Sequence, residues 1–228
     1  MKYDLILFDV DGTLLDFDMT EKVALEETCK EYGYECTSEM LESYHHINIE
    51  CWKKLEQGLI DKKELAFIRF NEFFNKFNMS GDPVEFNTKY RARLGEGAYL
   101  IENAVEICEN LYGKVDLAVA SNGGKDIQYN RLRKVDLEKY FKYLFISEEV
   151  GYNKPDIRYF DYIFQKAQIK NPEKVLIVGD SLTADIQGGN LAGIKTCWYN
   201  PKNLSNTDNI KIDYTIKNLL ELKEIVEL

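Results

Sequence analysis

The chain has 228 residues, 45% hydrophobic and 30% charged, which is typical of one or two globular domains and unlike a disordered chain. The formal net charge is −10 and no basic cluster occurs, which disfavours nucleic acid and anionic membrane as partners because both bind a concentrated lysine and arginine face. No apolar run approaches the roughly 20 residues of a membrane-spanning helix, and no feature indicates an obligate protein partner.

The first predicted element is the apolar run Tyr3–Phe8. Asp9 and Asp11 follow it where a signal peptide would place small residues, so we interpret the run as a strand. The five cysteines form no CxxC pair and are odd in number. This usage is typical of a reduced, intracellular chain, and we expect a cytoplasmic protein.

Residues 17–95 show helical periodicity and contain no convincing strand. Turn sequences separate four expected helices: Lys22–Glu31, Glu39–Leu55, Lys63–Phe77 and Val84–Arg93. The third helix carries an aromatic stripe that is expected to form the core of this segment. The stripe consists of Phe67, Phe70, Phe74 and Phe77. One edge of it, or Phe17 and Tyr44, offers a surface on which a planar base could stack.

Further apolar runs follow the helical segment: Val115–Ala120, Tyr143–Ile146, Val175–Val178 and Ile194–Tyr199. Helical spacing separates the later runs, as in Ile157–Ala167. Strands alternating with helices predict an α/β fold, a doubly wound, Rossmann-like parallel sheet with helices on both sides. We expect this core at residues 1–16 and 96–228, with an all-helical domain inserted at 17–95.

Polar side chains gather where the predicted strands end. They are Asp9 and Asp11 after the first strand, Ser121 and Asn122 after the second, Lys154 beyond the third, and Asp180 and Asp185 after the fourth. Because function gathers at the carboxyl ends of strands in a parallel sheet, we expect these side chains to form one site. Clustered carboxylates repel one another unless a cation lies among them, and Mg²⁺ prefers such oxygen ligands. The sequence therefore predicts Mg²⁺ as a cofactor.

These groups suit phosphoryl transfer, which requires positioning, charge stabilisation and an in-line nucleophile. Lys154 supplies a positive charge, while Ser121 and Asn122 supply neutral donors to phosphoryl oxygens. An aspartate can act as the nucleophile and form a covalent aspartyl-phosphate. A second carboxyl group two residues on can protonate the leaving oxygen and then activate water. The predicted partner is a small phosphorylated metabolite.

The same residues form four motifs that resemble those of haloacid dehalogenase superfamily phosphatases, over essentially the whole chain. The motifs are DVDGT at 9–13, SN at 121–122, the lysine of YNKPD at 154, and GDSLTAD at 179–185. The resemblance implies Asp9 as the nucleophile and Asp11 as the acid–base residue. It implies a metal held by Asp9, the backbone carbonyl of Asp11, and Asp180. Thr13 and Asp185 are then supporting residues, and residues 17–95 correspond to a helical cap.

Ile146–Asp156 and Gly188–Asn200 also resemble the bacterial pyrimidine 5'-nucleotidases that act on non-standard nucleotides. The expected substrate is therefore a pyrimidine nucleoside 5'-monophosphate. A phosphoglycolate or sugar-phosphate phosphatase, or a mutase, of the same superfamily remains an alternative because it shares every core residue.

These residues also have other interpretations. A receiver-like module phosphorylated on Asp9 without turnover is disfavoured by Asp11, and a dehalogenase would need neither Asp11 nor Mg²⁺. Lys154 could instead be a solvated loop residue, and Asp185 could contact the metal directly. His45 and His46 are adjacent on a helix and cannot both face one metal site.

Overall fold

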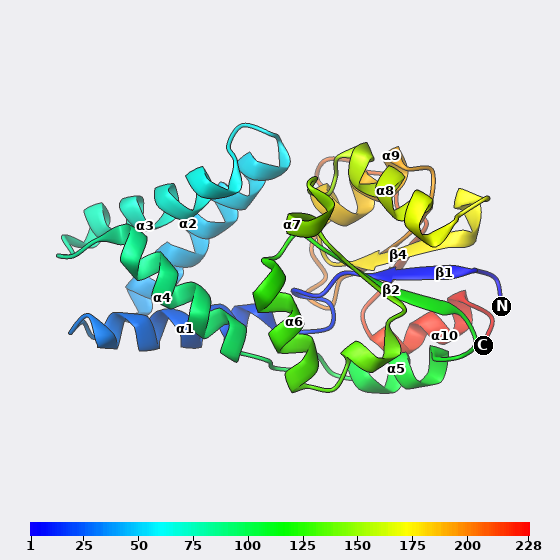
Figure 1. Cartoon of the computed structure of the whole chain (residues 1–228), viewed down its shortest axis with the longest axis horizontal. Coiled ribbons are helices and arrows are strands. Elements are labelled where there is room, and N and C mark those ends of the chain that lie inside the picture. Colours follow the sequence, from blue (N-terminus) through cyan, green and yellow to red (C-terminus); the bar gives the residue numbers. More distant parts are fainter. The chain divides into compact units, whose positions relative to one another are not determined.

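The computed structural model describes residues 1–228, which divide into two compact units. One unit combines Met1–Asp16 with Ala98–Leu228, and the other is Phe17–Gly97. The first contains every strand of the sheet and the second consists of helices (Figure 1).

The sheet of the first unit is entirely parallel, as the sequence predicts. Its strands are β1 (Leu5–Phe8), β2 (Asp116–Ser121), β3 (Tyr143–Ile146), β4 (Val175–Gly179), β5 (Lys195–Tyr199) and β6 (Tyr214–Ile216). They lie in the order β3-β2-β1-β4-β5-β6. The central β1 is buried along its whole length, with Ile6 and Phe8 in one hydrophobic core and Leu5 and Leu7 in the other. A strand covered on both faces has no polar side, which explains its continuous apolar sequence.

Helices cover both faces of this sheet (Figure 1). α5 (Ala104–Leu111) and α10 (Leu222–Ile225) pack on one face, and α8 (Ile157–Ala167) and α9 (Gln187–Leu191) on the other. α6 (Lys125–Lys134) follows β2, and the short α7 (Ser147–Val150) follows β3. α8 has the bounds that its apolar spacing predicts. The last helix, α10, ends at Ile225.

The helical unit contains α1 (Phe17–Glu31), α2 (Ser38–Glu56), α3 (Lys62–Phe77) and α4 (Pro83–Glu96). Capping side chains fix three of the starts. Thr37 accepts a hydrogen bond from the Met40 N–H, Asp61 forms a capping box with Glu64, and Asp82 precedes Pro83 at the first turn of α4. α1 starts at Phe17, earlier than the expected Lys22.

The aromatic core of the helical unit differs from the predicted stripe. Phe70, Phe73 and Phe74 are buried, whereas Phe67 is 49% exposed. The buried arc of α3 is rotated because it also includes Arg69, whose guanidinium donates hydrogen bonds to side chains of α2 and α4. Tyr44 is fully buried and stacks on Phe70 at a ring-centroid distance of 5.0 Å. The suggestion that Tyr44 offers a stacking surface is therefore wrong.

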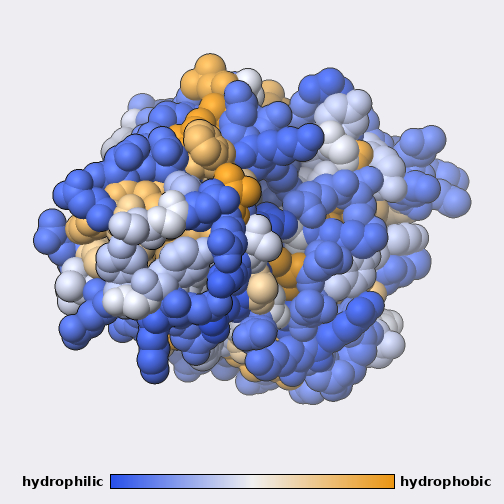
Figure 2. Space-filling view, turned by 60° about the vertical axis from the view of Figure 1, so that its left-hand side comes forward, coloured by the Kyte–Doolittle hydropathy of each residue, from blue (hydrophilic) through white to orange (hydrophobic).

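The surface in view in Figure 2 is mostly hydrophilic, with apolar residues in small groups. No helix combines the length and the apolar character needed to cross a membrane. His45 contacts the buried Glu21 at 2.7 Å, and neither His45 nor His46 belongs to a cluster of three potential metal ligands.

Candidate active site

The site lies where the strand order reverses. The chain proceeds from β1 towards β2 and β3 on one side and from β4 towards β5 and β6 on the other, so β1 and β4 flank a topological switch point. Asp9 and Asp180 follow these two strands directly, and the Asp9 N–H donates to the Val178 carbonyl at 2.9 Å. Gly12 has a φ of +83°, and a Cβ atom there would overlap the Asp180 carboxylate. The glycine therefore lets the turn after β1 approach the end of β4.

Three of the predicted aspartates come together in this crevice. Carboxylate oxygens of Asp9, Asp180 and Asp185 lie within 4.8 Å of one another. Asp9 and Asp185 are buried, and Asp180 is exposed to solvent. Burial raises the pKa of Asp9 to about 7, with a further contribution from the carboxylates of Asp185 and Asp11, although Lys154 opposes the shift.

Lys154 is the cationic centre of the cluster. Its side chain is 1% exposed, and Nζ donates hydrogen bonds to Asp9 Oδ1 at 2.7 Å, Asp185 Oδ1 at 2.5 Å and the Ala120 carbonyl at 2.5 Å. Burial alone would lower the pKa of Lys154, but the carboxylates of Asp185 and Asp9 outweigh it and raise that pKa. The interpretation of Lys154 as a solvated loop residue is wrong.

Ser121 and Asn122 end β2 beside this lysine. The Asn122 side chain forms a reciprocal pair with the Lys154 backbone, accepting from its N–H at 2.7 Å and donating to its carbonyl at 2.9 Å. The Ser121 hydroxyl accepts hydrogen bonds from the Gly123 N–H at 3.0 Å and from Gln128 Nε2 at 2.8 Å. The amide of Asn122 thus joins β2 to the loop that carries Lys154. The sequence does not predict this structural role.

The supporting residues occupy different surroundings. Asp185 accepts from Lys154 through Oδ1 and from the Ser181 N–H through Oδ2 at 3.1 Å, so each of its carboxylate oxygens has a protein donor. Thr13 is fully buried, and its hydroxyl makes no hydrogen bond. Trp198 Nε1 donates to the Asp180 backbone carbonyl at 2.8 Å, so packing alone does not account for this tryptophan.

The Asp11 carboxylate makes contacts that sequence reasoning missed. Arg131 Nη1 pairs with Asp11 Oδ1, and Gln128 Nε2 donates to Asp11 Oδ2 at 2.5 Å. Both partners are fully buried residues of α6. The available signal was their spacing of three residues on one helix that begins directly after Ser121-Asn122-Gly123-Gly124.

The donor set fits a divalent cation. When all groups are ionised, four carboxylates and two cationic side chains give the site a formal charge of −2. They are Asp9, Asp11, Asp180 and Asp185, with Lys154 and Arg131. Mg²⁺ prefers oxygen ligands, and its charge of +2 would neutralise the charge of the site. Burial is the main cause of the raised pKa of Asp9, and the neighbouring carboxylates of Asp185 and Asp11 add to it.

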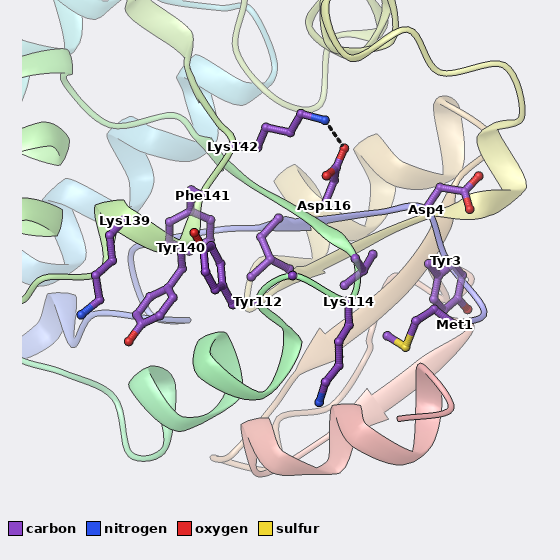
Figure 3. A pocket seen from close by; sticks show the side chains of 13 residues that line it. Met1, Tyr3, Asp4, Tyr112, Lys114, Asp116, Lys139, Tyr140, Phe141 and Lys142 are labelled. Atoms are coloured by element: carbon purple, nitrogen blue, oxygen red, sulfur yellow. Dashed lines mark hydrogen bonds and ion pairs between the residues drawn. The ribbon is translucent and has the colours of Figure 1, made fainter.

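A separate hollow of about 690 Å³ lies at the opposite edge of the sheet (Figure 3). Its lining includes Asp4, which precedes β1, and Asp116, the first residue of β2. Lys142 points towards Asp116 and pairs with it at 2.6 Å, and Lys139 pairs with Asp136 at 2.5 Å. This hollow contains none of the predicted site residues.

The comparison with known families agrees with the geometry at the switch point. Residues 6–199 match the sequence model of the haloacid dehalogenase-like hydrolases. The chain belongs to this family. The predicted resemblance to the superfamily is confirmed, and the assignment of this HAD-like protein as a hydrolase disfavours the non-catalytic receiver.

Full-length relatives of this HAD-like hydrolase include two pyrimidine 5'-nucleotidases. PynA of Streptococcus pneumoniae is 38% identical over 100% of this chain and 96% of its own length. YjjG of Escherichia coli is 31% identical over 99% of both chains. The crystal structure of the HAD-hydrolase YfnB of Bacillus subtilis, bound to magnesium, is 38% identical, covers 100% of both chains and has a TM-score of 0.95.

Proposed function

We propose that this hydrolase is a Mg²⁺-dependent phosphatase that acts on pyrimidine nucleoside 5'-monophosphates through an aspartyl-phosphate on Asp9. The observation that carries the proposal is the Lys154 ammonium group, which contacts Asp9 and Asp185, two members of the acidic triad at the switch point. A buried cation next to a buried carboxylate is the arrangement that a phosphoryl group entering the crevice requires.

The reaction has two halves. In the first, an Asp9 carboxylate oxygen attacks phosphorus, the bond between phosphorus and the ester oxygen breaks, and the Asp11 carboxyl group gives its proton to that oxygen. In the second, the Asp11 carboxylate takes a proton from water, whose oxygen attacks phosphorus and displaces Asp9, releasing inorganic phosphate. Lys154 and Ser121 stabilise the negative charge on the phosphoryl oxygens in both halves.

The residues that would hold Mg²⁺ are Asp9, the backbone carbonyl of Asp11, and Asp180, with Asp185 and Thr13 in support. Bound Mg²⁺ supplies charge neutralisation for the nucleophile and the phosphoryl oxygens. The magnesium in the YfnB structure and its full-length match to this chain support this choice of ion.

Two relatives support the proposed substrate. Both PynA and YjjG are named pyrimidine 5'-nucleotidases and match essentially the whole chain, including Phe17–Gly97. We assign Phe17–Gly97 as the cap domain of this family, the part expected to set substrate choice. The crevice residues serve any phosphomonoester, so they do not separate a nucleotide from phosphoglycolate or a sugar phosphate.

A panel of phosphomonoesters tests the proposal. Purified protein with Mg²⁺ is assayed for phosphate release from dUMP, dTMP, purine nucleotides, phosphoglycolate and a hexose phosphate, with the Asp9→Asn variant as a control for contaminating phosphatases. The pyrimidine nucleotides should lead in kcat/KM by about tenfold, or roughly 1.4 kcal/mol in transition-state binding. If phosphoglycolate or a hexose phosphate leads, the nucleotidase assignment is wrong and the phosphatase assignment stands.

A further inference from the structure

Two buried side chains of α6 contact the Asp11 carboxylate, and the proposed reaction assigns no role to them. Gln128 and Arg131 are 0% exposed, and each contacts a different carboxylate oxygen of Asp11. Arg131 Nη1 also donates to Gln128 Oε1 at 3.2 Å. The two side chains therefore form one unit that fixes the Asp11 carboxylate at both oxygens.

This unit is tied to the phosphate-binding end of β2. Gln128 Nε2 donates to Asp11 Oδ2 at 2.5 Å and to Ser121 Oγ at 2.8 Å, so one amide group links the two residues. A Cβ atom at Gly123 would overlap the Gln128 side chain, which means that the turn after β2 is shaped to admit it. The relative placement of Asp11 and Ser121 is thus set by the buried residue between them.

We propose that Gln128 and Arg131 are positioning residues that hold the Asp11 carboxyl group in place for proton transfer to the leaving oxygen. The inference rests on the proposed function. Asp11 lies in a turn and its side chain is 26% exposed, so the contacts with Arg131 and Gln128 oppose rotation of its carboxyl group towards solvent. A proton donor that is held in place acts at a high effective concentration, and one that rotates freely does not.

The leaving group provides the readout. As the bond from phosphorus to the ester oxygen breaks, an alkoxide must receive the Asp11 proton, whereas p-nitrophenolate leaves without one. Benzyl phosphate and p-nitrophenyl phosphate are similar in size and differ in this respect. The ratio of their kcat/KM values reports proton donation in the first half-reaction, and it does not depend on the fraction of protein that is folded or loaded with metal.

The variants are Arg131→Met and Gln128→Met, with Arg133→Met as the matched control on the same helix. Arg133 pairs with Glu138 at the surface and is 60% exposed at its side chain. Arg131→Met should lower kcat/KM for benzyl phosphate by about 10–100-fold and that for p-nitrophenyl phosphate by about threefold at most, given the usual size of general acid catalysis. Arg131→Lys should recover part of the loss. In an Asp11→Asn background, Arg131→Met should leave the ratio unchanged, because the group it positions is absent.

An equal loss with both substrates would mean a structural role for α6 and would overturn the inference, as would a faster reaction of benzyl phosphate in Arg131→Met. If Arg131→Met cannot be purified, the same ratio of kcat/KM values is measured in Gln128→Met and Arg131→Lys. Failure of the proposed function looks different: the wild-type protein is then inactive on both substrates, or Asp11→Asn has the wild-type ratio.

Discussion

Lys154 Nζ lies 2.7 Å from Asp9 Oδ1, although the two residues are 145 positions apart in the chain. Both side chains are buried, so each charge is stabilised by the opposite charge of its partner and not by water. Removing one member of a buried ion pair leaves the other uncompensated, which typically costs about 3–5 kcal/mol. We therefore expect Lys154 to contribute to stability in addition to its proposed role in phosphate binding.

Lys154→Met should therefore lower both kcat/KM and the thermal midpoint. Lys142→Met is the matched control, because Lys142 forms a half-exposed pair with Asp116 whose loss should cost about 0–1 kcal/mol. Thermal unfolding followed by circular dichroism, together with steady-state kinetics, measures both effects. Kinetics unchanged within about twofold would contradict a role of Lys154 in charge stabilisation.

Asp9→Asn should abolish turnover, because an amide of the same shape is a poor nucleophile. The fold should remain intact because Lys154 keeps its ion pair with Asp185. We expect kcat to fall by about 10³-fold or more. Acid quenching with a phosphorus-labelled substrate should trap a phosphoenzyme in the wild-type protein and in the exposed control Asp4→Asn, and none in Asp9→Asn. Turnover within about tenfold of the parent would remove Asp9 from the nucleophile's role.

Metal binding should depend on pH through Asp9. Its pKa is raised to about 7 without a cation, so near pH 6 a proton competes with the metal for this carboxylate. Burial and the neighbouring carboxylates also raise the pKa of Asp180, so Mg²⁺ affinity should rise with pH by about tenfold per unit or more below pH 7. Titration calorimetry in two buffers of different ionisation enthalpy also counts the released proton. Affinity that is constant from about pH 5.5 to 7.5 would contradict this expectation.

EDTA should abolish activity, and Mg²⁺ should restore it.

Trp198→Phe should weaken metal binding with little effect on the fold. The indole N–H donates to the Asp180 backbone carbonyl at 2.8 Å, and phenylalanine keeps an aromatic ring at this position but lacks that donor. The loss of one hydrogen bond of about 1 kcal/mol predicts a several-fold weaker affinity for Mg²⁺. Trp52→Phe in the helical unit is the matched control. An unchanged Mg²⁺ affinity in Trp198→Phe would show that this bond does not hold Asp180 in position.

The strands and the chemical groups at their ends were readable from the sequence. Continuous apolar runs mark strands buried on both faces, and a parallel sheet brings their carboxyl ends to one edge, so the sequence predicts that Asp9 and Asp180 meet. The sequence also predicts α8, because its buried residues recur at the helical period along a single segment.

Tertiary structure alone decided which face of α3 is buried and what surrounds Asp11. Phe73 replaces Phe67 in the core because Arg69 finds partners on α2 and α4, and no local pattern encodes partners on other helices. Gln128 and Arg131 contact Asp11 across 117 and 120 positions. Periodicity reports how residues of one segment share a face, whereas contacts between segments depend on how the whole chain packs.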